Sequence, residues 1–369
     1  MRGSAPGRLD LLGGVADYSG ALVLQLPTRL RTDVSATPDD ALVVGPVTLR
    51  PDELRDLAAL EYEAVRRALA AWPRWTHYVV GVAIVLVRHG LVEPSRLRLR
   101  LEVTSDLPPS VGVASSAALE VATARALGAE GTVDPLRLAT LCQEAENHIV
   151  GAPCGVMDQV AVALGVAGHV LPILCRPASV AAPVALPDGL EVVGWPTGAP
   201  HDVGGEPYGR ARSAAFMGKR IVEARTGCVW PWVSQLPREA VDALPEAVDG
   251  ATFLDHWGGT DDDVTMVLES ETYPVRAATL FGVEEHVRST HARAALEANE
   301  PTLLGPLLAE SQAGYDAMGL GHPAASAIVA EALARPGVYG ARSSGGGCGG
   351  TVVVACAPGS LDDIAGLIR

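Results

Sequence analysis

The sequence predicts an α+β protein of two lobes. Its helical and strand-like segments are mixed, without the regular strand–helix–strand repeat of a parallel α/β sheet. The 369 residues are enough for two domains with full cores, because one domain usually takes roughly 100 to 200 residues. A connection rich in proline and alanine lies between two strand-like runs near the middle of the chain. We place the domain boundary there, which gives domains over 1–180 and 181–369.

The first half of the chain begins with a predicted hairpin and continues with helices that surround one further strand. Gly13-Gly14 and Gly20 supply the turn between two apolar runs, and the stretch 96–103 alternates polar and apolar residues with the period of a half-buried strand. Small residues spaced along 115–128 predict a closely packed helix that ends at a glycine. In chain order we expect a hairpin over 8–28, helices around 54–65 and 75–87, a strand over 96–103, and helices over 115–128 and 135–149.

The second half is predicted to be mainly helical between strands. Apolar runs at 168–175 and 190–195 predict strands, and β-branched residues on both sides of a glycine loop predict a pair of strands from Val338 to Ala355. The helices are expected at 208–227, 274–297, 301–315 and 323–334.

Composition and charge exclude several classes of function. Hydrophobic residues make up 48% of the chain and charged residues 19%, as in a protein that folds. With 28 basic and 43 acidic residues the net charge is −15, which repels nucleic acids and anionic lipids, so we expect neither as a partner. The longest apolar run, Tyr78 to Val87, is shorter than the roughly 20 residues of a membrane span, and we expect a cytoplasmic protein with reduced cysteines.

The segment 108–117 joins a strand to a helix through a turn of small residues. In such a turn, backbone N–H groups at a helix N-terminus can bind phosphate oxygens. The lone lysine, Lys219, belongs to no Walker A motif, so any nucleotide phosphate must be held in another way. Taken alone, the segment is more often a plain structural turn, because a Pro-Gly turn before an alanine-rich helix is common.

Two further segments are candidates for chemistry. Glu146 and Asp158 lie on either side of a Pro-Cys-Gly turn, where one acid could accept a proton and the other could bind Mg²⁺, although either could simply be solvated. The segment 340–350 has five glycines within six positions between two strands, which favours close approach of the backbone to a ligand or another loop.

These three segments together resemble the three motifs of the GHMP kinases in order, in spacing and in chain length. Ala5 to Gly13 with Asp17-Tyr18 resembles the galactokinase signature, and Trp75 to Gly81 resembles the helix that lies near the nucleotide in that family. Within the family, Gly13 to Gly20, His201 to Gly209 and Ala215 to Gly218 are most similar to the L-arabinokinase branch.

The resemblance implies a two-lobed GHMP kinase fold with the active site between the N-terminal and C-terminal domains, and it implies ATP and Mg²⁺ as cofactors. Gly14 and Val15 stand where galactokinases carry the Glu and His that contact the C6 hydroxymethyl group of galactose, and Pro200 stands where they tend to carry Arg. We therefore expect a sugar-1-kinase that converts L-arabinose and ATP to L-arabinose 1-phosphate and ADP. The alternatives are a galactokinase or another aldose-1-kinase, and a non-enzymatic sensor of sugar and ATP.

The resemblance also assigns site residues. The catalytic pair would be Arg8 and Asp158, and the Mg²⁺ ligands Ser116 and Glu146. Sugar binding is assigned to Asp17, Gly14, Val15, Gly155 and Tyr208. Nucleotide binding is assigned to Trp75, Ser110, Val111, Gly112, Val113, Ala114, Ser115, Ser116, Ala117 and Gly346. The chain departs from the family pattern at Ser110, where glycine is usual, and at Val113, Ala114 and Ser343-Ser344. The sequence leaves the oligomeric state open.

Overall fold

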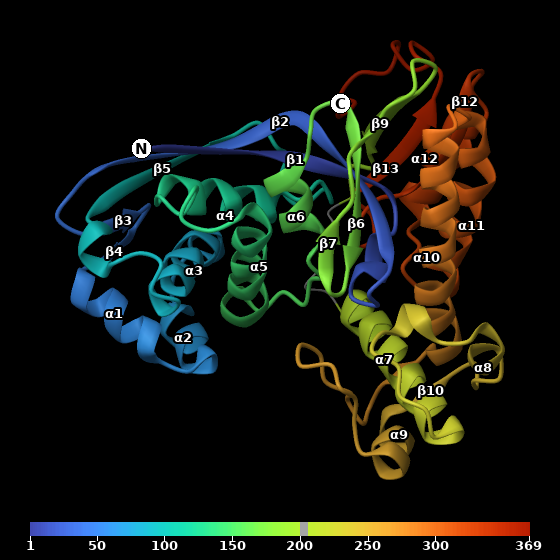
Figure 1. The fold of residues 1–369 in the computed structure, drawn as a ribbon, viewed down its shortest axis with the longest axis horizontal. Helices are drawn as coiled ribbons and strands as arrows, with labels where there is room; N and C mark the ends of the chain where they lie inside the picture. Colours follow the sequence, from blue (N-terminus) through green and yellow to red (C-terminus); the bar gives the residue numbers. More distant parts are fainter. Residues whose placement is uncertain (200–205) are drawn as a thin grey trace. The chain divides into compact units, whose positions relative to one another are not determined.

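The computed structural model describes residues 1–199 and 206–369, which group into two compact units (Figure 1). Unit 1 comprises Met1–Arg8, Pro27–Pro109 and Ala114–Gly165, and unit 2 comprises Leu9–Leu26, Ser110–Val113 and Val166–Arg369. The mixture of helices and strands without a regular repeat confirms the predicted α+β class. The units combine separate stretches of chain, and the linear domain boundary after residue 180 stays a prediction.

One end of a mixed sheet lies in unit 1, where helices pack against it. The second half of β2 (Leu22–Pro38) pairs antiparallel with β5 (Leu99–Ser105), from Thr32 opposite Ser105 to Pro38 opposite Leu99. The short strand β3 (Leu42–Val44) pairs parallel with β5 and antiparallel with β4 (Val47–Leu49).

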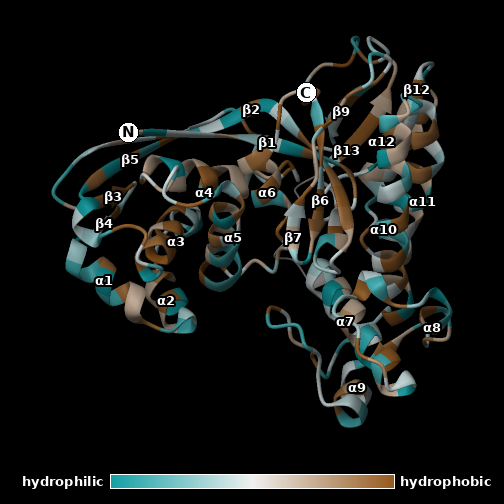
Figure 2. Ribbon diagram, in the orientation of Figure 1, coloured by the Kyte–Doolittle hydropathy of each residue, from teal (hydrophilic) through white to brown (hydrophobic). Residues whose placement is uncertain are grey.

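The helices of unit 1 pack around α3, α4 and α5, which contact one another. Helix α3 buries an unbroken run from Val79 to Leu86, and Figure 2 shows it as a largely apolar helix. Alanines at the centre of α4 allow its neighbours to approach closely. The helices are α1 (Pro51–Ala59), α2 (Tyr62–Leu69), α3 (Arg74–Arg88), α4 (Ser115–Ala126), α5 (Pro135–Ala145) and α6 (Met157–Leu164), with a π-helical turn over Glu146–Val150.

The sheets of unit 2 carry the C-terminal strands. An antiparallel sheet has the order β12 (Val338–Ser343), β13 (Thr351–Cys356), β9 (Glu191–Pro196), and its central strand is buried throughout. The first half of β2 pairs with β6 (His169–Cys175), which also pairs with β7 (Ala178–Val180) and β8 (Val184–Ala185).

The long helices of unit 2 enclose an aromatic core. Helix α10 contacts α7 and α11, while α11 and α12 pack on β12 (Figure 1). The helices are α7 (Glu206–Thr226), α8 (Arg238–Asp242), α9 (Gly250–Trp257), α10 (Val275–Glu297), α11 (Leu304–Ala317) and α12 (Pro323–Leu333), and β10 (Val248–Asp249) pairs with β11 (Thr272–Tyr273). The 3-10 turn η1 (Gly14–Asp17) lies between β1 (Arg2–Leu12) and β2 and contributes Val15 to this core.

Most of the predicted elements are confirmed, with shifts at their ends. The single helix expected around 54–65 is two helices, α1 and α2, because Leu60 and Glu61 have extended backbone conformations, and the strands of the hairpin expected over 8–28 extend to Arg2 and Pro38. The helix expected over 135–149 ends as an α-helix at Ala145 and continues as the π-helical turn, and the helix expected from 301 begins at Leu304 after a short 3-10 turn. The elements that were not predicted from the sequence are α6, α8, α9 and the short strands β3, β4, β7, β8, β10 and β11. Within the described residues, no helix combines the length and hydropathy needed to span a bilayer. Nor does any cysteine there form a disulfide bond.

Candidate active site

Arg8 of β1 and Asp158 of α6 form a two-pronged ion pair within unit 1. Arg8 Nε donates to Asp158 Oδ1 at 2.9 Å, and Arg8 Nη2 donates to Oδ2 at 2.8 Å. The Arg8 side chain is 3% exposed and that of Asp158 is 21% exposed. The carboxylate is therefore fixed in direction by a buried guanidinium and still has an edge open to a ligand.

The local sequence explains how Asp158 reaches this position. Residues 153–155 form the Pro-Cys-Gly turn, and Gly155 is buried there. Helix α6 begins at Met157, so Asp158 lies in its first turn, where the helix dipole favours a negative charge. The fold thereby brings together two predicted residues that are 150 positions apart.

Glu146 lies where α5 gives way to the π-helical turn, and its side chain faces a polar cluster in unit 1. Its Oε2 accepts from Gln159 Nε2 at 2.5 Å and from Cys154 Sγ at 3.4 Å, and the Ser116 side chain also hydrogen-bonds to the carboxylate. Burial, reinforced by the charge of Asp158, raises the pKa of Glu146 to about 7. Two acids thus lie close enough to repel each other.

The oxygens of Ser116 and Glu146 fit a hard divalent cation. Carboxylate and hydroxyl oxygens are ligands of Mg²⁺, and a cation beside Glu146 would offset the repulsion between the two acids. In the part of the chain that the structure describes, no cluster of three or more His, Cys, Asp or Glu side chains is arranged for a metal. The pair fits the usual mode of Mg²⁺ binding, in which one or two protein ligands are completed by water and nucleotide phosphates.

Gln159 and Glu120 hold this cluster together, and neither was predicted from the sequence. Gln159 Nε2 also donates to Glu120 Oε2 at 3.1 Å, so the amide bridges the two glutamates. Glu120 is fully buried in α4, and burial together with the charge of Glu146 raises its pKa well above the usual range. A glutamate among the small and apolar residues of a closely packed helix was the available signal.

The candidate phosphate loop has three residues in the left-handed region of backbone conformation. Ser110, Gly112 and Ala114 have φ values of 56°, 77° and 58°. Glycine adopts this conformation without strain, which explains why it suits position 110. No side chain caps α4 at Ala114, so the first N–H groups of the helix are not used by a cap and can face an anion.

The remaining candidate nucleotide residues differ in their exposure. Trp75 is 41% exposed and packs over Gly45, where a Cβ would lie 2.7 Å from the indole. Val111 accepts a hydrogen bond from Thr351 Oγ1 at 2.7 Å, which ties the loop to β13 within unit 2. Val113 and Ala117 are buried, whereas Ser115 is half-buried. Gly346 is buried in the glycine loop between β12 and β13.

The candidate sugar residues of unit 2 lie in and around η1. Val15 is 1% exposed, Asp17 3% and Tyr208 5%. Asp17 Oδ1 accepts from the Tyr18 N–H at 2.6 Å, and the rings of Tyr18 and Tyr208 meet edge to face with centroids 6.0 Å apart. The turn is therefore held rigidly in an aromatic setting. Of the segment His201 to Gly209, residues 201–205 lie outside the described residues, as does Pro200.

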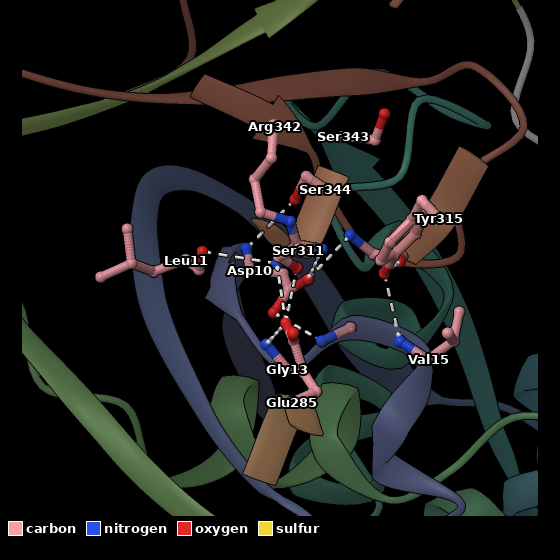
Figure 3. A network of polar contacts seen from close by, with 12 residues as sticks. Asp10, Leu11, Gly13, Val15, Glu285, Ser311, Tyr315, Arg342, Ser343 and Ser344 are labelled. Atoms are coloured by element: carbon pink, nitrogen blue, oxygen red, sulfur yellow. Dashed lines mark hydrogen bonds and ion pairs between the residues drawn. The ribbon is translucent and has the colours of Figure 1, made fainter. Parts of the chain in front are cut away.

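A buried polar network anchors the start of η1, and the sequence analysis did not find it (Figure 3). Asp10 Oδ1 accepts from the Gly14 N–H at 3.1 Å, and Asp10 Oδ2 is paired with Arg342 Nη2 at 3.0 Å, with both side chains 0% exposed. Glu285 Oε1 accepts from the Gly13 N–H at 3.0 Å. The available signal was an aspartate between leucines in a predicted strand, since such a charge is buried only with a partner.

Comparison with known proteins identifies relatives along almost the whole chain. Residues 77–166 match the family described as GHMP kinases N terminal domain, and residues 292–365 match GHMP kinases C terminal. The chain is 33% identical to a galactokinase of Chloroflexus aggregans, with 95% of this chain and 82% of that relative covered. It is 32% identical to L-arabinokinase of Arabidopsis thaliana, again over 95% of this chain, but it spans only 42% of that relative's length.

Solved structures show the same fold at low sequence identity. The galactokinase of Lactococcus lactis, solved with galactose, superposes with a TM-score of 0.76 at 21% identity, covering 96% of this chain and 85% of that one. The mevalonate kinase of Methanococcus jannaschii superposes with a TM-score of 0.60 at 12% identity, covering 100% of this chain and 96% of that one.

Proposed function

Because the chain belongs to the GHMP kinase family, and within it to the sugar kinases of the galactokinase and arabinokinase type, we propose that it phosphorylates L-arabinose. The reaction moves the γ-phosphoryl group of ATP to the anomeric hydroxyl, and the products are L-arabinose 1-phosphate and ADP. The enzyme is an ATP-dependent phosphotransferase, and the identity of the sugar is the part that we propose.

The observation that carries the catalytic part of the proposal is the pair of Arg8 and Asp158. Asp158 receives or polarises the proton of the attacking hydroxyl, because it is an acid held in one direction with part of its carboxylate exposed. Arg8 holds that carboxylate and adds positive charge beside the phosphoryl group in transfer. Such reactions depend chiefly on positioning and electrostatics, which a rigid ion pair supplies.

The position and chemistry of further residues suit them to bind the nucleotide and the metal. The backbone of residues 110–117 and the start of α4 hold phosphate oxygens, Trp75 offers a ring face to the base, and Gly346 lets the C-terminal glycine loop approach the nucleotide. Ser116 and Glu146 would hold Mg²⁺, which, when bound, neutralises charge on the phosphates.

The proposed preference for a pentose depends on the absence of polar side chains at Gly14 and Val15. Asp17, Tyr208, Gly155 and the backbone of η1 bind the ring hydroxyls, which L-arabinopyranose and D-galactopyranose arrange in the same way. Neither a glycine nor a valine offers a hydrogen-bond partner to the sixth carbon's hydroxyl. A hydroxyl that loses water without gaining a partner costs about 1 to 3 kcal/mol, so the pentose is preferred.

Two other substrates or roles compete with this one. A galactokinase activity is favoured by the relative of which this chain covers 82%. A sensor that binds both ligands without turnover is disfavoured, because the ion pair and the hydroxyl of Ser116 beside Glu146 are both present.

Release of ADP from Mg-ATP in the presence of a panel of free sugars tests the proposal. We expect kcat/KM for L-arabinose to exceed that for D-galactose by at least roughly tenfold, as the cost of the unpaired hydroxyl requires. Competition between the two sugars in one reaction gives the ratio directly. Phosphorylation of galactose as fast as arabinose would refute the choice of pentose and leave the kinase assignment intact.

A further inference from the structure

The side chain of Tyr315 occupies the space beside Gly14, the residue on which the choice of sugar depends. Gly14 has a φ of 47°, and a Cβ built on it would lie 1.7 Å from Tyr315 Oη and 2.9 Å from both Tyr315 Cζ and Arg342 Nη2. A contact under 3 Å between such atoms requires one of them to move. Tyr315 is 0% exposed, so its ring has no open space to enter.

Tyr315 is held at that position by contacts with buried neighbouring residues. Its ring meets Phe281 edge to face at 5.3 Å between centroids, and the guanidinium of Arg342 lies 4.9 Å from its centroid. Arg342 is itself fixed by its buried pair with Asp10. Gly347 leaves room for the ring, because a Cβ there would lie 2.9 Å from Tyr315 Cδ1.

The hydroxyl of Tyr315 also joins two candidate binding segments. It accepts from the Val15 N–H at 3.2 Å (Figure 3). It also donates to the carbonyl oxygen of Gly345. Val15 belongs to the candidate sugar turn, and Gly345 begins the glycine loop that holds the candidate nucleotide residue Gly346. The hydroxyl of Tyr315 therefore holds the backbone of both the sugar turn and the glycine loop.

We propose that Tyr315 is a positioning residue for sugar specificity: its hydroxyl takes the place of a side chain at position 14 and holds the backbone of Val15. The inference rests on the proposed function, because it takes η1 as part of the sugar site. It explains why position 14 is restricted to glycine in this chain. It also means that Gly14→Glu, which would restore the galactokinase pattern, cannot be accommodated while Tyr315 is present.

A double-mutant cycle tests the exclusion of a side chain without any sugar. Gly14→Ala should lower the melting temperature of the wild-type protein, and the loss should be at least about 1 °C smaller in a Tyr315→Phe background, where the closest atom is gone. Gly227→Ala is the matched control, because Gly227 also has a positive φ, 71°, but no atom within 4 Å of its Cβ. Its effect should be the same in both backgrounds.

Kinetics of Tyr315→Phe test the link to specificity. This variant loses the acceptor of the Val15 N–H and keeps the ring, so the turn becomes freer to shift and to let a water molecule pair with the C6 hydroxyl, which has no partner in the wild-type protein. We expect the ratio of kcat/KM for L-arabinose to that for D-galactose to fall by roughly tenfold. A purely structural tyrosine would lower the melting temperature and leave this ratio unchanged.

The outcomes separate the inference from the proposed function. If Gly14→Ala is harmless, or equally damaging in both backgrounds, Tyr315 does not exclude a side chain at position 14 and the inference is overturned. An unchanged sugar ratio in Tyr315→Phe overturns the role in specificity. Failure of the wild-type protein to prefer L-arabinose would instead refute the proposed substrate, and the thermal cycle would still decide whether Tyr315 and Gly14 are coupled.

Discussion

Replacement of Asp158 by Asn separates the chemistry of the candidate active site from its stability. The amide has the shape of the carboxylate but no charge, and only one of its two terminal atoms can accept a hydrogen bond. Arg8, which is 3% exposed and bonded to both oxygens of Asp158, then keeps one acceptor and meets an NH₂ group at the other position. The variant removes the negative charge and leaves the buried guanidinium partly satisfied.

The two expected effects differ in size and can be told apart. Breaking a fully buried ion pair costs about 3 to 5 kcal/mol, but one hydrogen bond remains and Asp158 is 21% exposed, so we expect a loss of stability of about 1 to 3 kcal/mol. With an unfolding entropy of about 2.1 cal/mol/K per residue over 369 residues, that lowers the melting temperature by about 1 to 4 °C. Turnover should fall by at least about 10²-fold, or about 2.7 kcal/mol in the barrier, as expected for one positioned acid–base or electrostatic group.

ADP release at 25 °C measures turnover, and a circular dichroism melt shows that the variant remains folded at that temperature. The matched control is Asp363→Asn, because Arg335 also contacts both oxygens of Asp363, at 2.8 and 2.9 Å, but that aspartate is 65% exposed. Exposed pairs contribute about 0 to 1 kcal/mol, so the control should keep its turnover and nearly its melting temperature. Near-normal turnover of a folded Asp158→Asn variant would show that the pair is not at the reacting centre.

Two further predictions concern the metal and the pH dependence of stability. Glu146→Gln should raise the Mg²⁺ concentration needed for half-maximal turnover at fixed ATP, because an amide is a poorer ligand for a hard cation, and an unchanged midpoint would assign the metal to other residues. Burial lowers the pKa of His286 from 6.5, and its Nδ1 accepts from the Leu22 N–H at 3.0 Å. The stability that the neutral imidazole contributes is therefore complete above about pH 6.5, and it declines as the pH falls through the pKa of His286 in the folded protein. His286→Asn keeps an acceptor that does not titrate, and it should lose less melting temperature than the wild type between about pH 7.5 and 5.5; an equal loss would contradict this account.

Local patterns in the sequence were sufficient to predict most of the elements. Helices α7 and α10 are long segments rich in alanine and arginine, which favour helix, and β13 carries a run of β-branched residues after the glycine loop. Helix α6 has only eight residues and follows directly on the Pro-Cys-Gly turn, so no repeat of apolar positions was long enough to reveal it.

The candidate site could be predicted only in part, because its contacts join residues far apart in the chain. Arg8 and Asp158 were paired through the family resemblance, since nothing local in either segment indicates a partner 150 positions away. Tyr315 lies at the end of the helix predicted over 301–315, and its position against Gly14 depends on how α11 packs. Spacing along one chain carries no information about such packing.

The separation of Asp10 from Arg342 has a consequence for the making of the protein. The two residues of this fully buried pair are 332 positions apart, so at a synthesis rate of about 5 to 20 residues per second Asp10 leaves the ribosome roughly 20 to 60 s before its partner. Unit 1 has all of its residues once Gly165 has been made, whereas unit 2 must keep Leu9–Leu26 available until the last strands emerge. The segment Leu9–Leu26 is thus among the last to reach its final surroundings, and a nascent chain halted before β12 would hold an aspartate that lacks its buried arginine partner.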